Sequence, residues 1–328
     1  MESETQMKET CLPAPCVRGR FAPSPSGRMH LGNIWCALLA WLSVRSQKGS
    51  MILRIEDLDT DRCRPEYAEQ LMDDLHWLGL DWDEGPDQKQ TDAPYFQSEC
   101  AELYEQALKK ISHRAQIYPC YCSRADLHTA SAPHLSDGTV LYSGRCRHLS
   151  QEQRKTLEQS GRRPSLRVAV PDCTIQFTDG LYGFKEQNLC CECGDFLLRR
   201  SDGVFAYQLA VVVDDGRMNV TQIVRGRDLL SSTPRQIWLQ TLLGLSQPDY
   251  IHTPLLCAQD GRRLSKREHD LDMSALRKRY TPAQLTGRLG FLAGLVPSDA
   301  ECTPNDLISL FSWDKIPRQD VIIDTSNW

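Results

Sequence analysis

Two short segments, far apart in the chain, combine residue types that bind phosphate groups. The first is RFAPSPSGRMHLGN, from Arg20 to Asn33, and the second is RRLSKR, from Arg262 to Arg267. Glycines in the first segment permit close approach of the backbone, and the helix expected after it would offer its N-terminal amides to an anion. His30 and Asn33 can add hydrogen bonds to phosphate oxygens, and Lys266 can supply a positive charge. Together the two segments predict a nucleotide site.

The pattern of apolar residues around the first segment predicts the elements that position it. Residues 17–21 form a candidate strand, and an amphipathic helical pattern begins at Ile34. Residues 51–55 form a second apolar strand, and Pro65 opens a second helix. This alternation predicts a parallel sheet with crossover helices. Such sheets bind ligands at the carboxyl ends of their strands, where this interpretation places the first segment.

The two segments resemble the HIGH and KMSKS signatures of class I aminoacyl-tRNA synthetases, as His30-Leu31-Gly32-Asn33 and Arg263-Leu264-Ser265-Lys266-Arg267. The resemblance implies a Rossmann-type α/β core that binds ATP with Mg²⁺. It also implies that the carboxylate of an amino acid attacks the α-phosphate, so that positioning and electrostatic stabilisation carry the catalysis. The catalytic residues expected on this basis are His30, Asn33 and Lys266. The residues expected to bind ATP are His30, Gly32, Asn33, Arg263, Ser265 and Lys266.

The resemblance narrows to the glutamyl branch of class I. Four strings carry it: RFAPSP from Arg20, LRIEDLD from Leu53, DGVFAYQLAVVVDD from Asp202 and VRGRDLL from Val224. They imply L-glutamate as the amino acid, which has two carboxylates and one ammonium group. The residues expected to bind glutamate are Arg20, Phe21, Ala22, Pro23, Ser24, Glu56, Tyr207 and Arg225.

The side chains of this set divide by charge. Arg20 and Arg225 can each hold a carboxylate through a planar guanidinium. Tyr207 can donate a hydrogen bond, and Glu56 can pair with the ammonium group. For the side-chain carboxylate we favour Arg20 together with Tyr207. The alternative is that Glu56 and Arg225 form structural ion pairs at the ends of strands.

Two positions depart from the glutamyl pattern. Gln208 stands where many glutamyl enzymes have Asn, and Gly226-Arg227-Asp228 replaces a more usual Gly-Glu-Asp string. Because of the second departure, the resemblance does not predict which residues at 226–228 contact the adenosine part of ATP.

A further group of side chains has the donor types of a zinc site. Cys120 and Cys122 stand two residues apart, and Cys146 ends the string YSGRC. Three thiolates form a soft ligand set suited to Zn²⁺. From the residue types alone, His134, His148 and a water molecule are equal candidates for the fourth ligand.

The resemblance favours Tyr142 as that fourth ligand, because glutamyl-Q tRNA(Asp) synthetases carry CxC and then YxxxC in this insertion. It implies one structural Zn²⁺ held by Cys120, Cys122, Tyr142 and Cys146. A second cluster comprises Cys190, Cys191 and Cys193. Its only cysteine neighbour in sequence is Cys173, so we interpret this cluster as ordinary thiols.

A chain of 328 residues predicts one large domain with smaller modules. The expected division is a disordered extension (1–17), the first half of the core (18–80), an inserted acceptor-type zinc module (81–165), the second half of the core with the KMSKS-like loop (166–267), and a short helical region (268–328). Two short strands, over residues 166–170 and 174–177, are expected to belong to a small β element. Residues 231–243 are expected to form a helix that Gly244 ends.

Length separates two close relatives. Glutamyl-tRNA synthetases add a large anticodon-reading domain after the KMSKS loop, whereas only residues 268–328 follow it here. The resemblance therefore implies the glutamyl-Q group, which activates L-glutamate with ATP in the absence of tRNA and transfers it to queuosine in the anticodon loop of tRNA(Asp). The alternatives are a truncated or divergent glutamyl-tRNA synthetase that charges the 3′ end, and a non-catalytic paralogue that binds tRNA. Retention of both signatures disfavours the paralogue.

Composition restricts the environment of the protein. The net charge of −5 argues against a general basic surface that coats nucleic acid. No apolar run approaches the span of a membrane helix, and the N-terminus lacks the features of a signal peptide. We therefore expect a cytoplasmic protein with no membrane segment. The family resemblance implies a monomer. The 14 cysteines are expected to be free thiols apart from the metal ligands.

Overall fold

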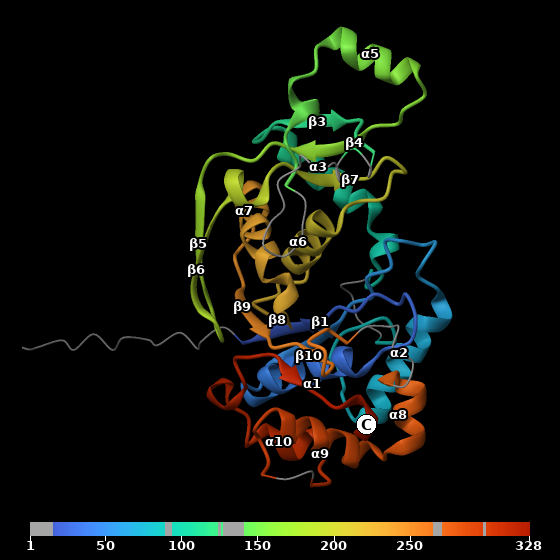
Figure 1. The fold of residues 1–328 in the computed structure, drawn as a ribbon, viewed down its shortest axis with the longest axis vertical. Coiled ribbons are helices and arrows are strands. Elements are labelled where there is room, and N and C mark those ends of the chain that lie inside the picture. Colours follow the sequence, from blue (N-terminus) through green and yellow to red (C-terminus); the bar gives the residue numbers. More distant parts are fainter. Residues whose placement is uncertain (1–15, 89–93, 124–125, 127–140, 265–270, 298–299) are drawn as a thin grey trace, which may run out of the picture.

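The computed structural model describes residues 16–88, 94–123, 126, 141–264, 271–297 and 300–328 (Figure 1). Three of the sequence-based expectations fall outside these ranges. They concern the first 15 residues of the expected extension, the candidate ligand His134, and the loop residues Ser265 and Lys266.

A six-stranded sheet lies at the centre of the fold, with the strand order β2-β1-β8-β9-β5-β6. Its strands are β1 (Arg18–Phe21), β2 (Ser50–Leu53), β5 (Thr174–Asp179), β6 (Gly183–Asn188), β8 (Gln222–Gly226) and β9 (Asp249–Thr253). All neighbouring pairs are parallel except the β5–β6 hairpin at one edge. The expected parallel α/β core is confirmed.

Helices cover both faces of this sheet. They are α1 (Leu31–Ser46) and α2 (Pro65–Leu78) on one side, and α6 (Tyr207–Arg217) and α7 (Thr233–Leu243) on the other (Figure 1). Helix α1 is apolar on most of its surface because it packs against both the sheet and the C-terminal helices. Helix α7 ends at Gly244, whose φ of 66° lies in the left-handed region, so this expected stop signal is confirmed.

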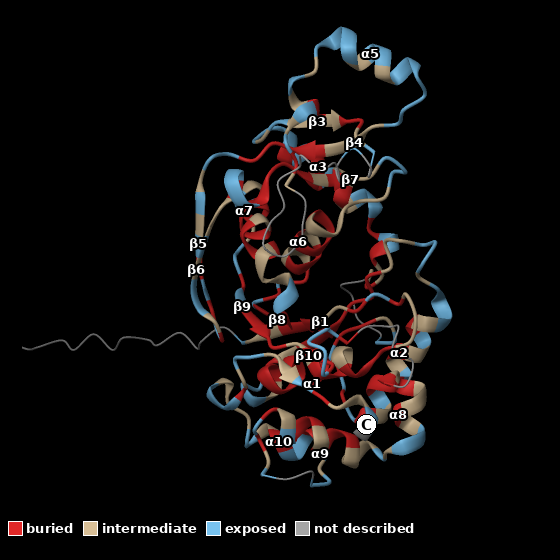
Figure 2. Cartoon of the chain, in the orientation of Figure 1, coloured by how far each residue is buried: buried red, intermediate tan, exposed pale blue. Residues whose placement is uncertain are grey.

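A second, three-stranded antiparallel sheet lies at the top of the molecule in Figure 1. It is formed by β3 (Ile117–Cys120), β4 (Ser165–Val168) and β7 (Phe196–Arg199). Helix α3 (Ala101–Ser112) packs beneath it, and α5 (Gln151–Gln159) projects from it with no buried residue (Figure 2).

One strand expectation is wrong in its placement. Residues 174–177 were expected in a small β element, but β5 lies in the large sheet between β9 and β6, and its Asp179 pairs with Tyr250 of β9. Its buried side chain Phe177 packs edge-on against Tyr250, with ring centroids 6.2 Å apart. The alternation of exposed and buried residues in β5 fits either sheet, so local periodicity could not decide between them.

The C-terminal residues fold back onto the core. Helices α8 (Met273–Arg279), α9 (Pro282–Leu292) and α10 (Pro304–Ile308) lead to β11 (Val321–Ile322), which pairs in parallel with β10 (Leu256–Cys257). The carboxylate of Asp320 accepts hydrogen bonds from the Arg227 guanidinium at 2.5 Å and from the Leu255 amide at 2.9 Å. The unusual Arg227 therefore anchors the segment that supports β10.

Among the described residues, none of the helices combines the length and the apolar character that crossing a bilayer requires.

Candidate active site

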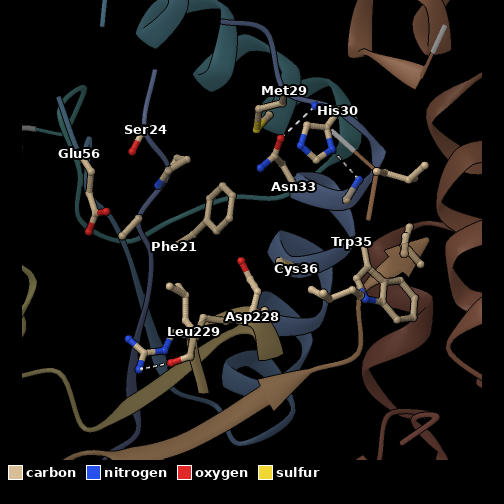
Figure 3. Close-up of a pocket in the computed structure, with 18 of the residues that line it drawn as sticks. Phe21, Ser24, Met29, His30, Asn33, Trp35, Cys36, Glu56, Asp228 and Leu229 are labelled. Carbon is tan, nitrogen blue, oxygen red and sulfur yellow. Dashed lines mark hydrogen bonds between the residues drawn. The ribbon is translucent and has the colours of Figure 1, made fainter. Parts of the chain in front are cut away.

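A cavity of about 620 Å³ opens at the carboxyl ends of β1 and β8. Every described residue that the sequence analysis assigned to ATP or glutamate lines it: Arg20, Phe21, Ala22, Pro23, Ser24, His30, Gly32, Asn33, Glu56, Tyr207, Arg225 and Arg263. Figure 3 shows Glu56 across this cavity from His30 and Asn33. The fold thus brings together two segments more than 200 residues apart in the chain, as expected for a parallel α/β sheet.

His30 and Asn33 cap the N-terminus of α1 reciprocally. The Nδ1 atom of His30 accepts a hydrogen bond from the Gly32 amide at 3.1 Å, and the Asn33 carboxamide oxygen accepts one from the His30 amide at 3.0 Å (Figure 3). The neutral imidazole must then carry its proton on Nε2. A Cβ atom at Gly32 would lie 3.0 Å from Cε1 of His30, so the glycine permits this close cap. The arrangement presents a helix N-terminus to the cavity.

Arg20 lies at the end of β1 and is 5 % exposed. Its Nε donates to the Asp215 carboxylate at 3.3 Å, and its Nη1 donates to the Val224 carbonyl at 3.2 Å. Within the described part of the chain, the Nη2 group and the second hydrogen of Nη1 have no partner. The outer edge of the guanidinium can therefore receive a carboxylate.

A buried ion network supports Arg20 and Glu56. Arg54, which is 1 % exposed, donates from Nη1 to Asp215 at 2.7 Å and from Nη2 to Glu56 at 3.1 Å. Burial alone would raise the pKa of Asp215, but the charges of Arg54 and Arg20 outweigh it and hold that pKa below its ordinary value. Burial raises the pKa of Glu56, although Arg54 and Arg20 act against it. Glu56 thus forms a buried ion pair and also faces the cavity.

The sequence analysis did not single out Arg54 or Asp215. The available signal was a charged residue inside an apolar string, since Arg54 stands between Leu53 and Ile55 and Asp215 follows the run AVVVD. A fully buried charge needs a partner, so such residues mark an ion pair even when the partner cannot be named.

Arg225 is held more tightly than Arg20. Its guanidinium donates to His252 Nε2 at 3.0 Å, to Gln236 Oε1 at 2.7 Å, to Thr233 Oγ1 at 2.8 Å and, more weakly, to the Leu229 carbonyl at 3.4 Å. Four of its five N–H groups therefore point at protein acceptors. Its edge toward the cavity offers one hydrogen where Arg20 offers three.

Tyr207 opens helix α6 and lines the same cavity as Arg20, Arg225 and Glu56. Burial raises the pKa of its phenol. The hydroxyl group stays protonated at neutral pH and can donate a hydrogen bond.

The three candidate metal ligands of the small sheet also come together. The sulfur atoms of Cys120, Cys122 and Cys146 all lie within 4.8 Å of one another, and the Tyr142 hydroxyl lies 3.4 Å from Cys120 Sγ and 3.8 Å from Cys122 Sγ. These separations are close to the edges of a tetrahedron around Zn²⁺, where Zn–S distances are about 2.3 Å. Arg167 donates from Nε to Cys120 Sγ at 3.3 Å and its guanidinium carbon lies 4.0 Å from the centroid of the Tyr142 ring.

The donor chemistry also fits a cation. Burial and the neighbouring Cys120 raise the pKa of Cys122 to about 12. Deprotonation of the Cys122 thiol at neutral pH would therefore need a positive charge beside it. The cluster of Cys190, Cys191 and Cys193 has no such arrangement within the described residues.

Comparison with known proteins assigns the family. Residues 16–315 match the family model described as tRNA synthetases class I (E and Q), catalytic domain. The chain belongs to this family. Membership implies a class I synthetase-like ligase that uses ATP. It also accounts for the presence of the HIGH-like cap at His30 and of Arg263, at the start of the KMSKS-like loop, in the lining of one cavity.

The relatives within the family fall into two groups. The chain is 50 % identical to the glutamyl-Q tRNA(Asp) synthetases of Nitratidesulfovibrio vulgaris and Symbiobacterium thermophilum, over 93 % of this chain and 95 % of each relative. It is 39 % identical to glutamate–tRNA ligase 2 of Syntrophus aciditrophicus, but spans 64 % of that protein. The crystal structure of a glutamate tRNA ligase from Elizabethkingia meningosepticum, in complex with its amino acid, superposes with a TM-score of 0.79 at 28 % identity, over 94 % of this chain and 67 % of that one.

Proposed function

We propose that this protein activates L-glutamate with ATP, without tRNA, and transfers the glutamyl group to queuosine in the anticodon loop of tRNA(Asp). One observation carries the proposal: a single cavity joins a phosphate-binding helix N-terminus to two arginines and a buried glutamate. The acceptor follows from the relatives, because 50 % identity over nearly the whole length is shared with glutamyl-Q tRNA(Asp) synthetases. Location in the cytoplasm and a monomeric state remain predictions.

Glutamate fits the charges of the cavity in one orientation. The open edge of the Arg20 guanidinium takes the side-chain carboxylate, with a hydrogen bond from the Tyr207 hydroxyl. Glu56 pairs with the α-ammonium group, and its ion pair with Arg54 keeps it in place. Arg225 contributes one N–H to the substrate. Phe21, Ala22, Pro23 and Ser24 form the remaining wall.

The activation step needs positioning more than a protein nucleophile. An oxygen of the glutamate α-carboxylate bonds to the α-phosphorus of ATP, the bond to the β-phosphate oxygen breaks, and pyrophosphate leaves. His30 Nε2 and the first amides of α1 stabilise the phosphates, with Asn33 fixing the imidazole through the cap. Arg263, which lines the cavity, and the loop residues Ser265 and Lys266 would complete the phosphate contacts. ATP would bind as its Mg²⁺ complex, and the metal would supply positive charge to the phosphates.

A second cavity provides a route for the acceptor. It has a volume of about 340 Å³ and shares Ser24, Glu56 and Tyr207 with the first, so both open on the same bound glutamate. Its wall carries Asp59 and Arg200, whose side chains are joined at 3.2 Å. The acceptor hydroxyl must reach the glutamyl carbonyl from the side that AMP does not occupy. We therefore place queuosine in this second cavity, where its hydroxyl attacks the carbonyl and AMP leaves.

Zinc belongs in this proposal as a structural ion. Cys120, Cys122, Cys146 and Tyr142 would hold one Zn²⁺, and the metal would supply folding free energy to the small sheet. Arg167 would stabilise the resulting negative charge from beside Cys120.

The decisive experiment uses labelled glutamate, ATP and purified tRNA(Asp) with and without queuosine. Each tRNA is tested intact and after removal of its 3′-terminal adenosine, and acid-precipitable label is counted. We expect label only on the queuosine-containing tRNA, undiminished by trimming. Label that trimming abolishes would instead identify a synthetase that charges the 3′ end. If no tRNA is labelled, glutamate-dependent ATP–pyrophosphate exchange distinguishes an active core from a non-catalytic paralogue.

Lys266→Ala separates catalysis from binding. We expect glutamate to bind the variant normally while ATP–pyrophosphate exchange falls by a factor of about 100 or more, the usual cost of removing one charge that stabilises the transition state. Arg262→Ala, four residues earlier in the sequence and paired with Asp260, is the matched control. Unchanged exchange in Lys266→Ala would contradict the role given to this lysine.

A further inference from the structure

Arg225 owes its orientation to residues that do not line the cavity. Its strand, β8, lies beside β9, and the register places Arg225 opposite His252. The next strand in the sheet, β5, ends at Asp179. The three side chains form a chain of hydrogen bonds across adjacent strands, from Asp179 to His252 at 2.6 Å and from His252 to Arg225 at 3.0 Å. His252 and Asp179 are fully buried or nearly so, at 0 % and 1 % exposure.

We propose that His252 is a positioning residue for glutamate recognition, with Asp179 fixing its tautomer so that it can accept a hydrogen bond from Arg225. This inference deepens the proposed function and rests on the assignment of Arg225 to glutamate.

The carboxylate of Asp179 determines which imidazole nitrogen carries the proton. One oxygen accepts from the amides of Leu181 at 3.0 Å and Tyr182 at 2.8 Å, and the other accepts from the His252 amide at 3.1 Å and from His252 Nδ1 at 2.6 Å. Three of these four contacts come from backbone amides, which can only donate, so the carboxylate stays ionised. An ionised carboxylate can only accept, so His252 Nδ1, 2.6 Å from it, must hold the proton. His252 Nε2 is then an acceptor, and it faces the Nε–H of Arg225. The opposite tautomer would set two N–H groups against each other.

A second arm holds the other side of the guanidinium. Gln236 accepts from Arg225 Nη1 at 2.7 Å through its carboxamide oxygen, and donates through its nitrogen to the Gln208 oxygen at 2.8 Å. Gln208 in turn donates to the Ser232 hydroxyl at 3.1 Å. The departure from Asn at position 208 thus lies in a chain of amides that ends on Arg225. The longer side chain of Gln lets position 208 reach Gln236 on the neighbouring helix.

The two arms leave Arg225 no freedom to turn. With His252 on Nε and Gln236 on Nη1, the guanidinium plane is fixed at both ends, and Thr233 holds Nη2 at 2.8 Å. A cation that cannot rotate presents its remaining N–H in one direction only, which lowers the entropy lost when a carboxylate binds. Loss of either arm should therefore weaken glutamate binding and leave ATP binding unchanged.

The test compares steady-state ATP–pyrophosphate exchange in the full chain and its variants. In Asp179→Asn, the carboxamide cannot accept from every donor that faces it, so the tautomer of His252 is no longer fixed. In His252→Phe, a ring of similar size removes the acceptor. We expect KM for glutamate to rise roughly ten- to a hundredfold in both, the range for losing a hydrogen bond to a charged group, with KM for ATP unchanged. His252→Gln, whose carboxamide oxygen can accept from Arg225, should recover part of the loss.

Asp195→Asn is the matched control, because it also removes a buried carboxylate, one that accepts from Tyr118 and from the Val170 amide in the small sheet. It should leave KM for glutamate unchanged. Equal rises of both KM values, or a KM for glutamate no higher in Asp179→Asn than in Asp195→Asn, would overturn the proposal.

The tautomer of His252 can also be measured in the unaltered protein, so this test does not depend on whether a variant folds. Long-range ¹⁵N–¹H correlation spectra should show the His252 imidazole with its proton on Nδ1 and a free base at Nε2. A proton on Nε2 would refute the inference directly. If the protein shows no glutamate-dependent exchange at all, the proposed function fails, while these spectra still decide whether the hydrogen-bond chain exists.

Discussion

Lowering the pH from 7 to 5 should reduce the free energy of unfolding by about 2 kcal/mol through His252 alone. Burial is the main cause, and it lowers the pKa of this imidazole from 6.5 to about 4. The charge of Arg225 acts in the same direction, whereas Asp179 and Asp228 act in the opposite direction. The ring of Tyr250, stacked at 6.4 Å, offers no charge that could compensate a proton.

The sign of the effect follows from proton binding in the two states. In the unfolded chain this histidine becomes protonated as the pH falls below 6.5. In the folded protein it stays neutral until the pH approaches about 4. The stabilisation is complete above pH 6.5 and is lost as the pH falls toward 4. Each pH unit in that window is worth about 1.4 kcal/mol, and incomplete titration near pH 6.5 reduces the total at pH 5 to about 2 kcal/mol.

Denaturant unfolding at pH 7, 6 and 5 provides the assay, applied in parallel to the unaltered protein and to His252→Gln. The chain contains eight histidines, so the informative quantity is the difference between the two pH slopes, which isolates position 252. The variant should lose about 2 kcal/mol less than the unaltered protein between pH 7 and 5. Parallel slopes would refute the reasoning, since they would mean that His252 titrates alike in the folded and unfolded states.

Three further predictions concern other parts of the fold. Arg20→Lys should raise KM for glutamate about tenfold or more in the exchange assay, because an ammonium group cannot replace the open edge of the guanidinium; an unchanged KM would remove Arg20 from the glutamate site. Elemental analysis should find about one zinc per chain, and a purified protein that contains no zinc would disprove the metal assignment. Chelation or Cys122→Ser should increase hydrogen exchange in β3 and leave β1 protected. Asp320→Asn should raise KM for ATP, because the Arg227–Asp320 ion pair supports β10, whose Leu256 lines the cavity. The rise should be at most about fivefold, since this ion pair is partly exposed. A rise in KM for glutamate alone would contradict a role of this segment in ATP binding.

Local sequence signals were sufficient for the elements and for the first wall of the site. Pro65 begins α2 and Gly244 ends α7, and each affects only the backbone of the few residues next to it. The same holds for the cap of α1, where His30 and Asn33 are three positions apart. These local signals therefore suffice to predict that the segment after β1 lies at the carboxyl end of the sheet.

The supporting residues could not be found in this way, because their partners are set by the order of strands in the sheet. Asp215 meets Arg20 across 195 residues, and Asp179 meets His252 across 73. Neither pairing leaves a trace in the spacing of residues. The misplacement of β5 has the same origin, since its alternating pattern records which side chains are buried and not which strand lies next to it. Tyr142 was favoured through family resemblance and not through its own chemistry.

The separation of Arg20 from its buried partners has a consequence for synthesis on the ribosome. At about 5–20 residues per second, the 195 residues between Arg20 and Asp215 take about 10–40 s to emerge. Throughout that interval strand β1 and helix α1 exist without the carboxylate that neutralises Arg20 and without β8 beside them. An unpaired guanidinium in strand β1 keeps that strand hydrated, so the charge that later receives the substrate also opposes premature burial of the half-made sheet.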